Sequence, residues 1–205
     1  MASRRTVASL TACLLLLAST VRSDEPSPTA VIEQLHEALI GVMKEAQQLD
    51  YQSRFGRLAP PITSAYDLDF MASKAAGSHW SGLGPEGQQR WLEAFRRFTV
   101  ANYAGRFDGF SGQRFETLGE EPGANETVVV RTVLRSPSNE DVQLNYRMRR
   151  TETAWRVIDV YLNGSVSELA LRRAEYSAAF DRSGLDEVIA NLESKIDDLS
   201  ADAGN

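Results

Sequence analysis

The segment from residue 142 to residue 180 constrains the fold more than any other part of this sequence. It begins with VQLNYRMR, in which apolar side chains occupy every second position, as in a strand with one buried face. A second run, WRVIDVYL at residues 155–162, is apolar on both faces and predicts a strand covered on both sides. Gly164 ends that strand, and Ser165 with Glu168 forms a Ser-x-x-Glu capping box. The segment therefore predicts the centre of a curved antiparallel sheet with a helix returning over it.

The first half of the chain has a helical period instead. Apolar residues recur every three or four positions over residues 31–49, after Ser27 as a candidate N-cap and Pro28 at the first helical position. This pattern predicts an amphipathic helix of about five turns. We next predict a short helix or turn at residues 51–58, followed by helices at residues 67–76 and 85–107. We expect Pro60 and Pro61 to end the first of these, because proline lacks the N–H that a helix interior needs.

The second half changes to a period of two. Strands are predicted at residues 113–118, 127–134, 142–150 and 155–162, and two helices follow at residues 166–182 and 185–199. Short turns between the strands make the sheet an antiparallel meander. The order of elements predicts an α+β fold, a curved four-stranded antiparallel meander sheet wrapped by N-terminal and C-terminal helices. We expect residues 24–205 to form a single domain.

Residues 1–23 have the features of a secretory signal peptide. Arg4 and Arg5 precede an apolar run with four consecutive leucines, and a small-residue cleavage site ends at Ser23. Removing this segment takes away three of the 22 basic residues and none of the 28 acidic ones, which leaves a formal charge of −9. It also removes Cys13, the single cysteine. The mature protein is therefore predicted to be exported, free of disulfides and unsuited to nucleic acid.

Catalytic motifs do not stand out in the sequence. We see no Gly-x-Ser-x-Gly elbow, phosphate loop or HExxH, and we expect no metal site and no cofactor. Of the two histidines, His36 is expected to be exposed beside glutamates on the first helix, whereas His79 follows a helix stop and is a candidate base. A catalytic triad assembled by the fold alone stays open, because such triads are defined by geometry.

Asp159 interrupts an otherwise apolar strand face. A buried carboxylate needs hydrogen-bond or charge partners. It is expected to anchor the start of the following helix or to pair with an arginine such as Arg172 or Arg173. The alternative is a functional acid inside a pocket.

The helices and strands also supply an unusual amount of apolar and aromatic material for one small curved sheet. Those side chains could surround a cavity or fill an ordinary core, and periodicity alone leaves both possibilities open. If there is a cavity, the candidate lining residues are Trp80, Leu83, Trp91, Phe95, Tyr103, Val129, Val133, Tyr146, Met148, Val157 and Tyr161.

Several stretches in order resemble the MlaC/toluene-tolerance (Ttg) family. They are YDLDFMA at residues 66–72, GSHW at 77–80, WLEAF at 91–95, NYA at 102–104, DV at 159–160, Gly164 with VS at 166–167, Phe180 and GLDEVI at 184–189. The run SELALRRAEY at residues 167–176 is more similar to the HpnM branch, which is associated with hopanoid lipids. The resemblance covers most of the chain from residue 32 to residue 196.

This resemblance implies a periplasmic lipid carrier. Such a protein would hold a hopanoid or a phospholipid in an apolar cavity and pass it between inner- and outer-membrane transport complexes, and we expect a monomer. Two other functions stay open. A small α+β enzyme of the isomerase or dehydratase kind would use His79 and Asp159 as its acid–base pair, and an exported adaptor would bind only proteins through an exposed apolar patch.

Overall fold

A sheet at one end and a group of helices at the other make up the computed structural model, which describes residues 25–137 and 140–202. The expected signal peptide, residues 1–23, lies outside the described residues. The helices and strands, in chain order, are α1 (Pro28–Glu45), η1 (Ala46–Gln48), α2 (Tyr51–Ala65), α3 (Leu68–Ala76), η2 (Gly77–Gly82), α4 (Gly84–Arg106), β1 (Arg114–Pro122), β2 (Val128–Arg135), β3 (Val142–Arg150), β4 (Trp155–Leu162), β5 (Val166–Ser167) and α5 (Glu168–Asp202).

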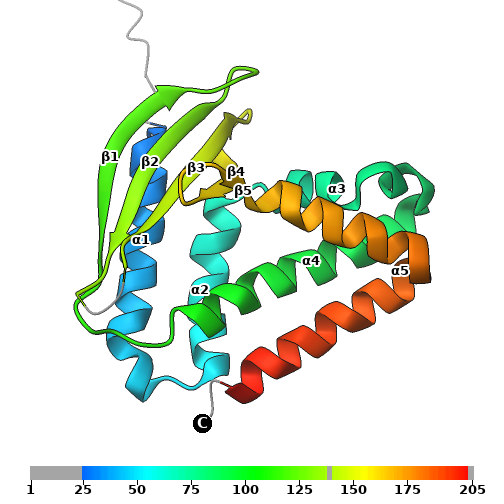
Figure 1. The fold of residues 1–205 in the computed structure, drawn as a ribbon, viewed down its shortest axis with the longest axis horizontal. Coiled ribbons are helices and arrows are strands. Elements are labelled where there is room, and N and C mark those ends of the chain that lie inside the picture. The colour runs from blue at the N-terminus through cyan, green and yellow to red at the C-terminus, as the bar shows by residue number, and fades with distance from the viewer. Residues whose placement is uncertain (1–24, 138–139, 203–205) are drawn as a thin grey trace, which may run out of the picture.

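The sheet is an antiparallel meander with the strand order β1-β2-β3-β4-β5. The α+β architecture expected from the sequence is therefore confirmed, and the two-residue strand β5 extends the predicted four-stranded sheet by one. Figure 1 shows the curvature of the sheet, with α1 and α2 beside it and α3, α4 and α5 reaching away from it. A bulge lies in the β3–β4 pairing, where Arg147 pairs with Asp159 but Met148 pairs with Val157. This bulge adds one residue to β4, so the side chains of β4 on its two sides alternate between the faces of the sheet in different phases.

Helix α2 continues through Pro60 and Pro61, so the predicted stop at residue 58 is wrong. Two prolines remove two N–H donors from the helix, which would leave the carbonyls of Gly56 and Arg57 without their usual partners. Both of these residues lie on the exposed face, where water can satisfy the carbonyls. The opposite face, with Leu58 and Ile62, is fully buried. Burial of that face therefore outweighs the loss of two exposed hydrogen bonds.

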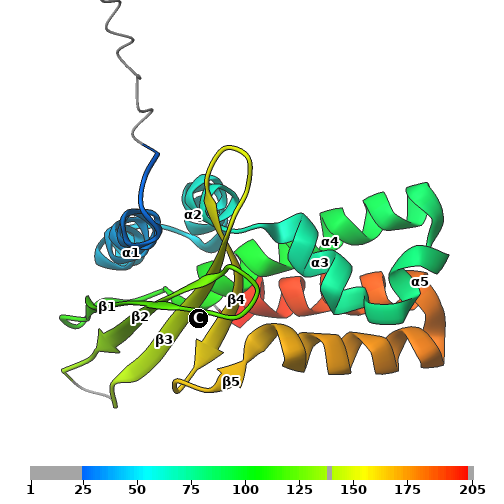
Figure 2. The same cartoon turned by 90° about the horizontal axis from the view of Figure 1, so that it is seen from above.

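Two glycines set the ends of helices. Gly77 follows α3 with a φ of 60°, a left-handed conformation that side chains with a Cβ rarely adopt. Gly184 interrupts α5 with a φ of 74° and a ψ of −178°. Figure 2 shows the result, two antiparallel arms of α5 of which the first leaves β5 and the second returns alongside α4. The two C-terminal helices expected from the sequence are these two arms.

The predicted capping box of Ser165 and Glu168 is wrong. Ser165 lies in the turn after β4, where its N–H donates to the carbonyl of Leu162. The chain then pairs once more with β4 before the helix begins, and Ser167 is the residue whose Oγ accepts a hydrogen bond from the N–H of Ala170. The cap is thus two residues later than the sequence pattern indicates.

One hydrophobic core joins the helices to the concave side of the sheet. It includes Ile32 and Leu39 of α1, Trp91 of α4 and Tyr146 of β3, all of them essentially inaccessible to solvent. No helix among residues 25–137 and 140–202 is both long enough and apolar enough to cross a membrane.

Candidate functional site

A pocket of about 960 Å³ opens between the concave face of the sheet and the helices. Its walls come from the sheet, the C-terminal half of α4, the loop from α4 to β1, the end of α1, the first turns of α5, and Tyr66 and Met71 from the α2–α3 junction and α3. The volume lies at the upper end of the ~300–1,000 Å³ that is usual for small-molecule sites. The buried side chains that form its floor are Met43, Tyr66, Met71, Phe95, Phe98, Tyr146, Val160 and Tyr176.

The register of the sheet explains why its wall is apolar. Three cross-strand pairs place apolar side chains next to each other on the same face, and all six residues line the pocket. The pairs are Leu134 with Val142, Leu144 with Leu162, and Tyr146 with Val160. The concave face of β2, β3 and β4 is therefore a continuous apolar surface on one side of the pocket.

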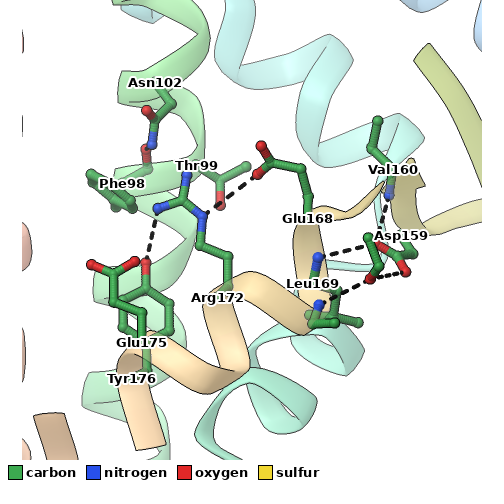
Figure 3. Close-up of polar contacts among 12 residues, drawn as sticks. Phe98, Thr99, Asn102, Asp159, Val160, Glu168, Leu169, Arg172, Glu175 and Tyr176 are labelled. Atoms are coloured by element: carbon green, nitrogen blue, oxygen red, sulfur yellow. Dashed lines mark hydrogen bonds and ion pairs between the residues drawn. The ribbon is translucent and has the colours of Figure 1, made fainter. Parts of the chain in front are cut away.

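Asp159 holds the first turn of α5 beside the pocket. Its side chain accepts hydrogen bonds from the N–H groups of Val160 (2.8 Å) and Leu169 (3.0 Å) and from the hydroxyl of Ser167 (2.6 Å). Figure 3 shows these contacts at the point where β4 and α5 meet. The expectation that Asp159 anchors the start of the following helix is confirmed. An acceptor at this position also compensates the N-terminal end of the helix dipole.

The anchored turn presents a charged pair to the pocket. Arg172 lies 3.7 Å from the carboxylate of Glu168, and its guanidinium lies 5.0 Å from the centre of the Phe98 ring. It also donates a long hydrogen bond of 3.4 Å to the hydroxyl of Tyr176. Figure 3 shows Arg172 reaching from α5 toward α4, with Thr99 on the facing helix. The pair gives one side of the pocket both a cation and an anion.

Tyrosine hydroxyls add a second polar feature to the pocket wall. The hydroxyls of Tyr66 and Tyr103 are hydrogen-bonded to each other, and both residues line the pocket. Burial raises the pKa of Tyr66 well above its ordinary value and that of Tyr103 to about 12. Both phenols therefore keep their protons at any physiological pH and remain hydrogen-bond donors.

His36 is buried, so the prediction that it is exposed is wrong. It contacts a third tyrosine of the pocket wall. Its ring stacks on Phe115 with centroids 3.7 Å apart, and its Nε2 lies 3.1 Å from the hydroxyl of Tyr146. Burial lowers the pKa of His36 from 6.5 to about 3, so the ring is neutral. The prediction failed because the stripe of α1 is wide enough to bury His36 next to Leu35.

Of the eleven candidate lining residues, Phe95, Tyr103 and Tyr146 lie on the wall of this pocket. Trp91, Met148 and Val157 are fully buried in the packed core instead, and Val129 and Val133 belong to the opposite face of β2. The remaining three, Trp80, Leu83 and Tyr161, are partly exposed away from the wall. A ligand role for the eight residues off the wall has no geometric support in this pocket.

The acid–base pair considered for an enzyme is not brought together. His79 stacks on Phe180 and its Nε2 lies 3.2 Å from a carboxylate oxygen of Asp181. The partners of Asp159 are the strand and turn residues described above, and neither His79 nor Asp159 lines the pocket. Among the described residues there is also no cluster of three or more histidine, cysteine, aspartate or glutamate side chains placed to hold a metal ion.

Sequence reasoning missed several wall residues that carried a usable signal. Phe98 follows Phe95 by three positions in the same stripe of α4, and Leu144 alternates with Tyr146 in β3. Tyr66 has no such signal, because it sits at the junction of α2 and α3. Its position is fixed by a parallel bridge to Val157 and by the N–H of Asp67, which donates to the Val157 carbonyl at 2.9 Å.

Two comparisons with known proteins bear on this site. A family model described as MlaC protein matches residues 33–194. A solved structure of a phospholipid-binding protein from Ralstonia solanacearum, in complex with a phospholipid, superposes with a TM-score of 0.71. The two sequences are 20% identical, and the match covers 88% of this chain and 100% of the other. At that identity the likeness establishes a shared fold.

Proposed function

The chain belongs to the MlaC family, and we propose that it binds a phospholipid or a hopanoid in the open pocket and carries it through the bacterial periplasm between the inner and outer membranes. The observation that carries this proposal is the pocket itself, with about 960 Å³ of space above a floor of buried apolar side chains. The phospholipid held by the structural neighbour supports lipid as the class of ligand.

Binding alone is sufficient for this role. Removing each methylene of an acyl chain from water contributes about 0.8 kcal/mol, so a chain of ~16 carbons gains on the order of 13 kcal/mol before the costs of ordering it. Apolar walls supply this gain without any reacting group. His79 and Asp159 stay outside the pocket in this proposal, and the protein is not an enzyme.

The polar groups fit the other end of such a ligand. Arg172, Glu168 and the exposed Arg106 line the pocket along with its apolar floor, and they would face a lipid headgroup while the tails occupy the floor. The exposed apolar side chains of Phe110 and Val142 also belong to the pocket wall. We propose that this opening faces the transport complexes of the two membranes, that the carrier is a monomer, and that it is released by cleavage near Ser23.

Native mass spectrometry of the purified protein, followed by solvent extraction and lipid analysis, tests the proposal. We expect about one lipid per chain, and the extracted lipid distinguishes a phospholipid from a hopanoid. Leu144→Glu places a charge on the pocket wall and is expected to abolish binding, whereas Leu171→Glu places the same charge at an exposed position off the wall. An apo mass for the unsubstituted protein, with no uptake from vesicles, would overturn the carrier and favour a protein-binding adaptor.

A further inference from the structure

The hydroxyl pair of Tyr66 and Tyr103 has one proton more than its internal hydrogen bond uses. Two hydroxyls bring two O–H donors, and a single hydrogen bond between them uses one. Among the described residues, neither hydroxyl has any other hydrogen-bond partner. One O–H donor at the pocket wall is therefore left without an acceptor.

An unpaired donor at this depth is costly. Tyr66 is only 3% exposed, and Tyr103 also lies on the pocket wall. A buried hydroxyl proton without an acceptor loses the hydrogen bond that water would give it. By contrast, the neighbouring Tyr146 hydroxyl has His36 as a partner 3.1 Å away. The Tyr66–Tyr103 pair therefore leaves a donor on the pocket wall that a ligand can satisfy.

The surroundings of the pair indicate which chemical group of the ligand could accept this hydrogen bond. The surrounding floor is apolar, with Met71, Phe95 and Val160 on the same pocket wall. A hydrocarbon tail alone would leave the donor unpaired, and a charged phosphate would be poorly placed among buried apolar side chains. A neutral carbonyl oxygen attached to the tails satisfies both conditions, because it accepts a hydrogen bond and carries no charge.

We propose that the Tyr66–Tyr103 hydroxyl pair recognises an acyl ester carbonyl of the bound lipid, so that the protein prefers ester-linked lipids over analogues without a carbonyl. This inference rests on the proposed function. The two hydroxyls are interchangeable donors, because either one can donate to its partner and leave the other free for the ligand. Removal of one hydroxyl leaves a donor in place, and only removal of both deletes the recognition.

The test is a competition between two lipids that differ only at the linkage. The protein is incubated with vesicles that contain equal amounts of diacyl phosphatidylethanolamine and its dialkyl ether analogue with the same chain length, and bound lipid is measured by native mass spectrometry. One neutral hydrogen bond predicts a roughly fivefold enrichment of the ester lipid in the unsubstituted protein. Tyr66→Phe and Tyr103→Phe should each keep most of the enrichment, and the double variant should bind both lipids equally.

Tyr51→Phe is the matched control, because the Tyr51 hydroxyl is also buried but lies off the pocket wall. It should keep the full enrichment. Equal loading of both lipids on the unsubstituted protein would overturn the inference while leaving the carrier function intact, and this readout does not require the double variant to fold. Enrichment that persists in the double variant would also overturn it. If neither lipid loads, the phospholipid form of the proposed function fails, and the ester inference fails with it.

Discussion

The protein has two aromatic regions that behave differently, and we call them the packed end and the open end. At the packed end, where α3, α4 and α5 meet, Trp91 is fully buried, its Nε1 donates to the carbonyl of Ala72 at 2.8 Å, and its ring lies 5.1 Å from Tyr176 and 5.2 Å from Phe180. At the open end, Tyr66 and Tyr103 stand on the wall of a pocket of about 960 Å³. Both regions contain aromatic side chains, but only the packed end is filled by them.

The two ends share side chains, which explains how one can stay open. Phe95 and Tyr176 line the pocket, and both also pack against the ring of Trp91. Protein interiors are close-packed, so an unfilled space persists only where its walls are held from behind. The contacts of Phe95 and Tyr176 with Trp91 keep these two rings in place on the pocket wall. One face of each ring therefore contributes to the stability of the protein, and the other face is available to a ligand.

Trp91→Ala gives the largest expected effect, because it empties the packed end. We expect the free energy of unfolding to fall by about 3–5 kcal/mol, the usual cost of removing a buried tryptophan. Urea denaturation followed by circular dichroism measures the change. Phe110→Ala removes an exposed aromatic ring from the pocket opening and should change stability by less than ~0.5 kcal/mol. Similar losses in the two variants would contradict the distinction between the two ends.

Acid should destabilise the contact between α1 and the sheet, behind Tyr146. Unfolded His36 binds a proton near pH 6.5, whereas burial lowers its pKa in the folded protein to about 3. Between these values the unfolded state binds more protons, so the free energy of unfolding falls as the pH decreases, by about 1.4 kcal/mol per unit and ~3 kcal/mol by pH 4. Carboxylates titrate in the same window, so the measurement is the difference between the unsubstituted protein and His36→Leu. Parallel pH profiles would mean that folded His36 can be protonated.

The sequence predicts the elements well where one periodicity operates alone. Strand β3 alternates cleanly, and the predicted range of residues 142–150 coincides with Val142–Arg150. The failures occur where a local rule competes with burial. Pro60 and Pro61 are strong helix breakers, yet α2 continues because its other face is buried against the core. A rule for isolated helices cannot anticipate that tertiary compensation.

The site was harder to predict because a pocket wall and a packed core have the same sequence signature. The three consecutive valines of β2, residues 128–130, fit either phase of the alternation, and the predicted wall residue Val129 lies on the face of β2 away from this pocket. The bulge beside Asp159 shifts β4 by one residue, which no alternation pattern reveals. The Tyr66–Tyr103 contact joins residues 37 positions apart, and only the fold brings them together.

Adding volume should distinguish the two ends directly. Ala72→Leu inserts atoms next to Trp91 at a fully buried position and is expected to cost about 1–3 kcal/mol. Val160→Phe adds atoms on the pocket floor, where space is available, and should change stability by less than ~1 kcal/mol while it reduces the amount of bound lipid. Denaturation and lipid quantification on the same preparations provide both readouts. Equal destabilisation by the two substitutions would mean that the floor is as tightly packed as the core.

Asp159→Asn tests the hydrogen bonds that connect the start of α5 to β4, and among these predictions it has the smallest expected effect on stability. The amide keeps one oxygen for the N–H groups of Val160 and Leu169, but it removes the negative charge from the start of α5 and one acceptor from Ser167. We expect a loss of about 1–2 kcal/mol. Because α5 starts at the pocket and runs on to the packed end, faster hydrogen exchange should be confined to its first turns, near Leu169.

Asp181→Asn is the matched control for that substitution. Asp181 lies on the first arm of α5 near the packed end, its side chain is 72% exposed, and one of its carboxylate oxygens lies 3.2 Å from Nε2 of His79. An exposed pair of this kind contributes little, so stability and hydrogen exchange should stay unchanged. If Asp159→Asn instead accelerates exchange around Trp91 as much as around Leu169, then α5 responds as one rigid unit, and the open end cannot loosen without the packed end.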